Sequence, residues 1–254
     1  NLADAEGFLL VPDLINYWLT GRQVAEQTNA STTGLLSIAT GQWDDALIEK
    51  LGIARRLFPE LVVAGTTLGP VRDDLGIRAN VVAVGSHDTA SAVVAVPATT
   101  DDFAYISCGT WGLVGVELNS PVLTEASRVA NFTNEGGVDG RVRYLHNVMG
   151  LWLLSECVRE WQKSDPSVDL LRLLAAASDF TVKVPVFDAN DATFMAPDAM
   201  PERIATWCTE HGLPAPQSQV EFVRSIIESL SVAFVDAVHT ASHLSGKPVS
   251  IIHI

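Results

Sequence analysis

Residues 81–96, VVAVGSHDTASAVVAV, decide the fold that we expect for this chain. Val81–Val84 is an unbroken β-branched and apolar run, which suits a strand buried on both faces. Gly85-Ser86-His87 breaks that run, and Asp88 opens an Ala- and Val-rich stretch that predicts a helix. The polar residues therefore lie where a strand ends and a helix begins, which is the usual ligand crevice of a layered α/β sheet.

A predicted hairpin follows this strand–helix junction. Ala104–Ser107 and Trp111–Val116 are short apolar segments joined by Cys108-Gly109-Thr110. The tip of such a hairpin offers a glycine, a hydroxyl and free backbone N–H groups, which suit an anion. Gly109 and Thr110 alone are weak evidence, because a plain turn explains them as well. Together with Asp88 they indicate phosphoryl transfer.

Composition excludes several classes of protein. The 254 residues are 48% hydrophobic and only 18% charged, which allows one or two packed domains and argues against disorder. The net charge is −14 with no basic run, so we expect no nucleic-acid partner. No segment approaches the roughly 18 apolar residues that span a bilayer, so we expect no membrane partner. Three cysteines without a CxxC pair favour a reducing compartment, the cytoplasm, without disulfides or zinc.

The remaining chain reads as alternating helices and extended segments. Pro97–Asp102 is the best candidate for a domain boundary, which divides the chain into residues 1–97 and 98–254. Asn147 is expected to cap a helix. Residues 131–147, NFTNEGGVDGRVRYLHN, are expected to form an exposed polar run. Helical spacing and punctuation predict helices near 8–19, 43–51, 148–161, 168–177, 202–211 and 219–244, and a buried strand over 248–254.

Asp88 is the candidate general base. A hydroxyl that attacks a γ-phosphate needs orientation and an acceptor for its proton, and a carboxylate at a strand–helix junction supplies both. The alternative is a helix N-cap, a position that Asp favours. His87 beside it either binds a substrate hydroxyl or is satisfied within the turn.

Other polar groups carry weaker hypotheses. Asn131, Asn134 and Glu135 beside Gly136-Gly137 either line a sugar pocket or form a surface turn. His239 and His243 stand four residues apart on a predicted helix, but no HExxH accompanies them, and we reject a metal site there. No nucleophile elbow such as GxSxG is present, so a hydrolase that uses His87 and Asp88 has little support.

Several segments together resemble the FGGY family of carbohydrate kinases. They are GSHDTASAV, SCGTWGLVGVE, NFTNEGG and LHNVMGLWLLSECVREW, and DLINYWLTG, QTNASTTGLL, WDDALIEKLGI and FPELVVAGTTLGPV match the family's preceding segments. The resemblance implies an α/β, actin-like (ribonuclease H-like) two-domain fold, with residues 1–97 in the N-terminal domain and 98–254 in the C-terminal domain. It also implies that ATP and a sugar meet in the cleft between the domains, with Mg²⁺.

The resemblance assigns roles residue by residue. Asp88 is the base that takes the proton from the 1-hydroxyl of L-rhamnulose, the sugar that the TNEGG and NVMGLWLL segments favour. The sugar is contacted by His87, Thr89 and Asn147, and the nucleotide phosphates by Gly109 and Thr110. Ser155 stands where relatives carry a Gln that contacts the nucleotide. L-fuculose, L-ribulose and D-xylulose stay open as substrates, and so does a catalytically silent sugar-binding relative.

Two family segments have no counterpart in the sequence. The glycine-rich phosphate loop with its metal-associated Asp is not found, nor is the glycine-rich adenine-binding motif that follows the strand at Val249–Ile254. The chain thus resembles a middle piece of such a kinase. We expect the isolated 254 residues to be catalytically inactive.

Overall fold

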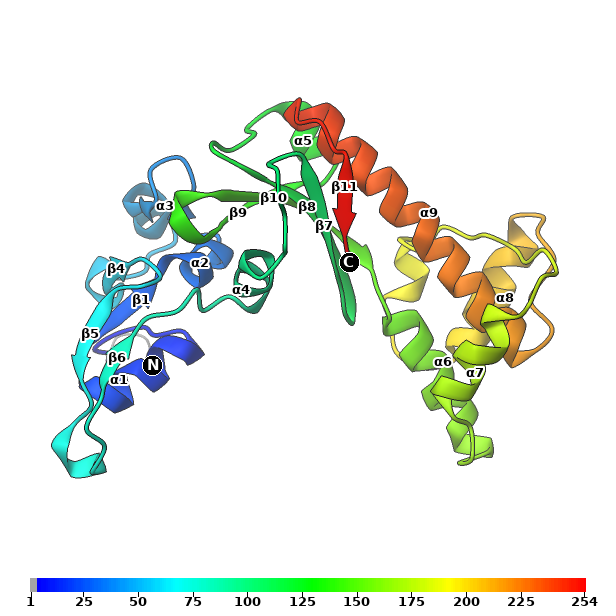
Figure 1. Cartoon of the computed structure of the whole chain (residues 1–254), viewed down its shortest axis with the longest axis horizontal. Helices are drawn as coiled ribbons and strands as arrows, with labels where there is room; N and C mark the ends of the chain where they lie inside the picture. The colour runs from blue at the N-terminus through cyan, green and yellow to red at the C-terminus, as the bar shows by residue number, and fades with distance from the viewer. Residues whose placement is uncertain (1–3) are drawn as a thin grey trace. The chain divides into compact units, whose positions relative to one another are not determined.

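The computed structural model describes residues 4–254 and divides the chain into two compact units (Figure 1). Unit 1 holds the described residues up to Phe103 together with Val116–Leu145. Unit 2 holds Ala104–Gly115 together with His146–Ile254. The chain thus passes from one unit to the other three times, after Phe103, Gly115 and Leu145, and each of these residues belongs to a strand. The boundary expected near residue 97 stays a prediction.

Unit 1 combines short helices with small sheets. Its helices, with 3-10 turns labelled η, are α1 (Val11–Thr20), α2 (Gln27–Ala30), η2 (Ser31–Thr33), α3 (Asp45–Lys50), η3 (Arg55–Leu57), η4 (Asp73–Leu75), α4 (Asp88–Val94), α5 (Glu125–Val129) and η5 (Val138–Gly140). Its strands are β1 (Val24–Glu26), β2 (Leu36–Ser37), β3 (Gln42–Trp43), β4 (Glu60–Val62), β5 (Thr67–Pro70), β6 (Asn80–Val82) and β9 (Thr133–Gly136).

β1 and β4 form a parallel pair in unit 1, with Val24 opposite Glu60 and Glu26 opposite Val62. Val24 and Val62 pack with Leu68 and Ala83 into one buried cluster. The residues at the two ends of α1 explain where the helix begins and ends. Pro12 lies in its first turn, and Gly21 ends it in the left-handed conformation.

The prediction that the strand at Val81–Val84 is buried on both faces is wrong. β6 covers Asn80–Val82 and pairs antiparallel with β5 in a two-stranded sheet. Ala83 is buried and Val81 packs against the same cluster, while Val82 and Val84 are 48% and 65% exposed. The side chains alternate because only one face of this small sheet is covered by the described residues. The break at Gly85 and the helix that begins at Asp88 are confirmed.

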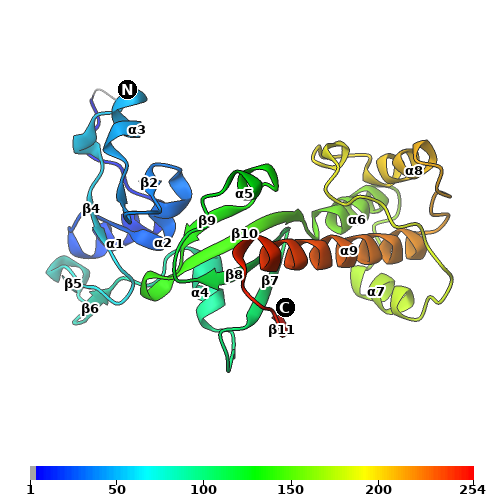
Figure 2. The ribbon, with the colours of Figure 1, turned by 90° about the horizontal axis from the view of Figure 1, so that it is seen from above.

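Unit 2 is built on a hairpin and a group of helices. The hairpin pairs β7 (Phe103–Cys108) antiparallel with β8 (Trp111–Leu118), as expected. The helices are α6 (Trp152–Ser164), α7 (Leu170–Ser178), η6 (Ala192–Phe194), α8 (Met200–Glu210) and α9 (Gln219–Ser245). α9 lies along α6 and α7 in both views, around a core that includes Leu153, Phe194, Ile204 and Ile226 (Figures 1 and 2). Within residues 4–254, no helix is both long enough and apolar enough to cross a membrane.

A five-stranded sheet has the order β11-β7-β8-β10-β9, with β10 at Val142–Met149 and β11 at Ile251–His253. Two expectations in this region are wrong. Asn147 caps no helix, because it lies within β10, and α6 begins at Trp152. The strand expected to be buried over 248–254 is β11, where Ile251 and Ile252 are 40% and 45% exposed. It is the first strand in the sheet order and has a neighbour on one side only.

A buried carboxyl group, that of Asp13, fixes α1 to β1. Its Oδ1 accepts a hydrogen bond from the backbone N–H of Glu26 at 3.1 Å, and its side chain is fully buried. Oδ2 has no hydrogen-bond partner among the described residues. Burial and, secondarily, the nearby Glu26 charge raise the pKa of Asp13 to about 6, although the Glu26 N–H opposes them.

We predict that Asp13→Asn stabilises the protein above pH 6 and has little effect near pH 4. The folded protein binds the Asp13 proton more tightly than the unfolded chain does. Its stability is therefore highest below the ordinary Asp pKa of 3.8, and the extra stability is lost as the pH rises through about 6. The full difference corresponds to about 3 kcal/mol. Urea unfolding of both proteins from pH 4 to 8 measures it. A difference in unfolding free energy that does not change with pH would contradict the prediction.

Candidate active site

The turn between β6 and α4 places His87 and Asp88 at the start of a helix in unit 1. Its chain path is tight, because a Cβ at Gly85 would lie 2.9 Å from Cγ2 of Val138. The hydroxyl of Ser91 donates a hydrogen bond to the carbonyl of Gly85 and closes the turn. His87 occupies the N-cap position with an extended backbone, so Asp88 is the first helical residue.

The buried carboxylate of Glu26 fixes this turn by hydrogen bonds. Its Oε2 accepts hydrogen bonds from the backbone N–H of Ser86 at 2.9 Å and from the Ser86 hydroxyl at 3.0 Å. Its Oε1 accepts from the N–H of Thr28 at 3.0 Å. The Thr28 hydroxyl donates to Glu26 and accepts from the N–H of His87 at 3.2 Å. Glu26 and Thr28 therefore fix the backbone of the two residues that precede Asp88.

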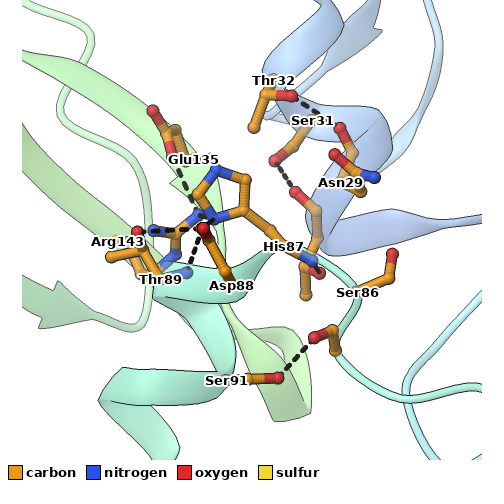
Figure 3. Close-up of polar contacts among 12 residues, drawn as sticks. Asn29, Ser31, Thr32, Ser86, His87, Asp88, Thr89, Ser91, Glu135 and Arg143 are labelled. Carbon is orange, nitrogen blue, oxygen red and sulfur yellow. Dashed lines mark hydrogen bonds and ion pairs between the residues drawn. The ribbon is translucent and has the colours of Figure 1, made fainter. Parts of the chain in front are cut away.

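His87 contacts an ion pair between β9 and β10, in which the arginine is fully buried and the glutamate is partly buried. Arg143 lies directly opposite Glu135 in the strand register, and its Nη2 donates to Glu135 Oε2 at 2.8 Å. The same Nη2 lies 3.3 Å from Nδ1 of His87, and Figure 3 shows these side chains turned toward one another. Burial first, and Arg143 second, lower the pKa of His87, while Glu135, Asp88 and Glu26 act in the opposite direction. The histidine ring is therefore biased toward its neutral form.

The Asp88 carboxylate is open to solvent. Its side chain is 97% exposed, and Oδ1 accepts from the N–H of Thr89 at 2.6 Å and from the Thr89 hydroxyl at 3.3 Å. Oδ1 also lies 3.7 Å from Nδ1 of His87. The N-cap interpretation of Asp88 is wrong, because His87 occupies that position. Thr89 itself is buried.

The predicted anion cradle lies in unit 2. The β7–β8 tip is fixed by the first residues of α6, since the N–H of Leu151 donates to Gly109 O at 2.9 Å and that of Trp152 donates to Thr110 O at 3.1 Å. This approach requires Gly150, where a Cβ would lie 2.6 Å from Gly109 O and from the carbonyl carbon of Trp111. Gly109 and Thr110 are exposed.

The structure groups the candidate residues within each unit. His87, Asp88 and Thr89 lie together in unit 1, and Gly109 and Thr110 lie together in unit 2. Asn147 is exposed on the part of β10 that belongs to unit 2, and Ser155 is exposed on α6. Across the described residues, no cluster of three His, Cys, Asp or Glu side chains is suited to a metal ion.

The sequence analysis missed the residues that support the site. Glu26 ends β1 and Thr28 lies in α2, and neither was singled out as a candidate site residue. The run expected to be exposed over 131–147 is wrong in its second half, because Arg143 is fully buried within β10. One signal was available. Glu135 and Arg143 have opposite charges and flank a glycine-rich turn, as cross-strand pairs do.

The sequence matches two family models. The model described as the N-terminal domain of the FGGY family of carbohydrate kinases matches residues 1–95, and the C-terminal domain model matches residues 104–254. Rhamnulokinase of Pectobacterium carotovorum is 41% identical over 246 residues, which are 97% of this chain and 49% of that protein. Rhamnulokinase of Yersinia pestis is 40% identical over 253 residues, which are 100% of this chain and 51% of that protein. The chain spans about half the length of the curated relatives it matches.

Solved structures of sugar and polyol kinases share the fold. A xylulose kinase from Brucella ovis superposes with a TM-score of 0.72 at 17% identity, over 98% of this chain and 51% of that chain. A Plasmodium falciparum glycerol kinase solved with ADP gives 0.68 at 16% identity, over 96% and 50% of the two chains. At these identities the likeness concerns the fold alone, and it confirms the expected α/β, actin-like class.

We predict that Glu26→Gln destabilises unit 1 by about 3 kcal/mol. The amide that replaces one carboxylate oxygen is a donor that faces the donors of Ser86 and Thr28. Urea unfolding measures the loss, and hydrogen exchange at the Ser86 and His87 amides measures the loosened turn. Glu60→Gln is the matched control, because Glu60 lies on the neighbouring strand in an exposed ion pair with Arg22. Equal effects of the two variants would contradict the role assigned to Glu26.

We predict that Gly150→Ala destabilises unit 2 by about 2 kcal/mol or more, because the new Cβ would meet backbone atoms that cannot move aside. Gly109→Ala is the control within the same tip, since a Cβ there would meet only Trp111 O at 3.6 Å. Thermal unfolding of both variants measures the effect. A larger loss in Gly109→Ala would show that the tip is not held by the close approach at Gly150.

Proposed function

The chain belongs to the FGGY family of carbohydrate kinases, and on that premise we propose that it contributes to the active site of an ATP-dependent kinase that phosphorylates L-rhamnulose. The observation that carries the proposal is the Asp88 carboxylate, which is 97% exposed at the end of a turn whose backbone is held by buried groups. An exposed carboxylate on a rigid support suits a general base.

The proposed reaction is an in-line transfer. The 1-hydroxyl of L-rhamnulose gives its proton to Asp88 while its oxygen attacks the γ-phosphorus of ATP. The bond from that phosphorus to the β,γ-bridging oxygen breaks, and ADP leaves with the electron pair. Because Oδ1 of Asp88 already accepts from the Thr89 N–H, Oδ2 is the oxygen that we assign to the proton. The Thr89 contact fixes the orientation of the carboxylate.

The remaining roles follow from position and from the family resemblance. His87, beside Asp88, would contact the sugar, and so would Thr89 and Asn147. Thr110 would donate to the nucleotide phosphates from the exposed tip in unit 2. Gly109 would contact them without donating, because its N–H already donates to Trp111 O at 3.0 Å. Mg²⁺ bound with ATP would neutralise charge on the phosphates, and no step of the proposal is routed through it. A kinase that depends on ATP belongs in the cytoplasm, where we place it.

The choice of sugar rests on the relatives. Proteins named rhamnulokinase are 40–41% identical to almost the whole of this chain. L-fuculose, L-ribulose and D-xylulose kinases are alternatives within the same chemistry, because a few hydroxyl contacts decide between such sugars. A silent sugar-binding relative is the alternative from another class.

The test is ADP release by the whole protein with Mg²⁺-ATP and each of the four ketoses. We expect turnover with L-rhamnulose and a loss of about 10³-fold in kcat in Asp88→Asn, with sugar binding retained. Asp45→Asn is the matched control, because Asp45 is likewise an exposed first-turn carboxylate of a helix in unit 1.

The outcomes separate the alternatives. Turnover with another ketose would keep the mechanism and change the substrate. Sugar binding without ADP formation would favour the silent relative. Loss of both binding and turnover in Asp88→Asn would give Asp88 a structural role. The expected inactivity of the 254 residues alone is measured in the same assay.

A further inference from the structure

The contact between Arg143 and His87 determines which ring nitrogen carries the proton. Nη2 of Arg143 lies 3.3 Å from Nδ1 of His87. A guanidinium has five N–H donors, no acceptor, and keeps its charge in proteins. The contact is therefore a hydrogen bond only when Nδ1 of His87 carries a lone pair. In the neutral ring, the single proton is then on Nε2.

Arg143 is held in this place by three constraints. It lies opposite Glu135 in the β9–β10 register, its Nε donates to Gly136 O at 3.2 Å, and its side chain is fully buried. Its Nη1 is buried and has no hydrogen-bond partner among the described residues. An unpaired buried donor is unfavourable, and an ion pair with Glu135 alone does not require it.

His87 is equally constrained, and its second nitrogen is open. Its backbone N–H donates to the Thr28 hydroxyl at 3.2 Å, and its side chain is 20% exposed. Nε2 forms no hydrogen bond with the residues that the structure describes. Burial and Arg143 favour the neutral ring, against the weaker influence of Glu135, Asp88 and Glu26. A neutral ring with an open Nε2–H is a hydrogen-bond donor.

We infer that Arg143 is a positioning residue that locks His87 as the Nε2–H tautomer, so that His87 donates a hydrogen bond to an oxygen of the sugar. This inference rests on the proposed function, in which His87 contacts the sugar. The lock has a second consequence for Asp88, whose Oδ1 lies 3.7 Å from Nδ1. Because Nδ1 carries no proton, it cannot donate to the carboxylate that must accept the proton of the sugar hydroxyl.

The tautomer is measured directly by ¹⁵N NMR of the whole protein labelled at histidine, with the His87 signals assigned by their disappearance in His87→Gln. We expect Nδ1 in the unprotonated range and Nε2 in the protonated range, with the Nε2–H signal shifted when L-rhamnulose is added. This measurement needs no change at Arg143. A protonated Nδ1 in the neutral ring would overturn the inference.

Arg143→Met tests the role of the guanidinium. We expect a mixture of tautomers and a KM for L-rhamnulose raised by about tenfold or more, with the KM for ATP unchanged. Arg143→Lys, which restores one donor, should recover part of the loss. Arg128→Met is the matched control, because Arg128 forms an exposed ion pair with Glu125 on α5. An unchanged tautomer in a folded Arg143→Met protein would overturn the inference.

The two proposals fail in different ways. A protein that phosphorylates no sugar but shows the Nε2–H ring would overturn the proposed function and leave the tautomer assignment supported. A protein that phosphorylates L-rhamnulose with a protonated Nδ1 would overturn the tautomer lock alone.

Discussion

The hydrogen bonds that converge on the buried Glu26 carboxylate are the constraint on which the candidate site depends. Donors from α2 and from the turn before α4 meet on its two oxygens, and Glu26 is only 1% exposed. A carboxylate in such a place is stable only when donors surround it, so the arrangement is cooperative. The short, half-exposed strand β6 cannot fix the turn that follows it. Glu26 and Thr28 do so instead.

Burial increases from Asp88, the proposed base, to the residues that support it. Asp88 is almost fully exposed, His87 is partly buried, and Arg143 and Glu26 are buried. This order suits a site that must admit a substrate at one end and hold its geometry at the other. It also explains why the exposed carboxylate needs few contacts of its own, since its orientation comes from Thr89 and from the turn behind it.

Neighbouring residues in the sequence were sufficient to predict the elements whose ends are set by glycines and whose faces are set by apolar spacing. The helix start after Gly85, the β7–β8 hairpin and the end of α9 at Gly246 follow from glycines and apolar spacing. The supports of the site depend on contacts between distant residues. Ser86 lies 60 positions from Glu26 in the sequence, and His87 lies 56 positions from Arg143. The hydrophobic spacing within a single helix or strand carries no information about such distant pairs. The burial of Arg143 likewise follows from strand pairing.

The charges of Arg143 and Glu135 act on the pKa of His87 in opposite directions, so the geometry of the pair is its more specific effect on the ring. An isolated arginine beside the sugar would attract any nearby anion, including phosphate groups that belong elsewhere. Glu135 at 2.8 Å balances that charge, and burial keeps the guanidinium from turning toward solvent. With the inferred tautomer the effect is directional, because Nδ1 accepts from the buried Arg143 and Nε2 carries the donor. If the proposed substrate is right, donors placed by backbone and side-chain geometry are a consistent way for a chain of net charge −14 to recognise a neutral sugar.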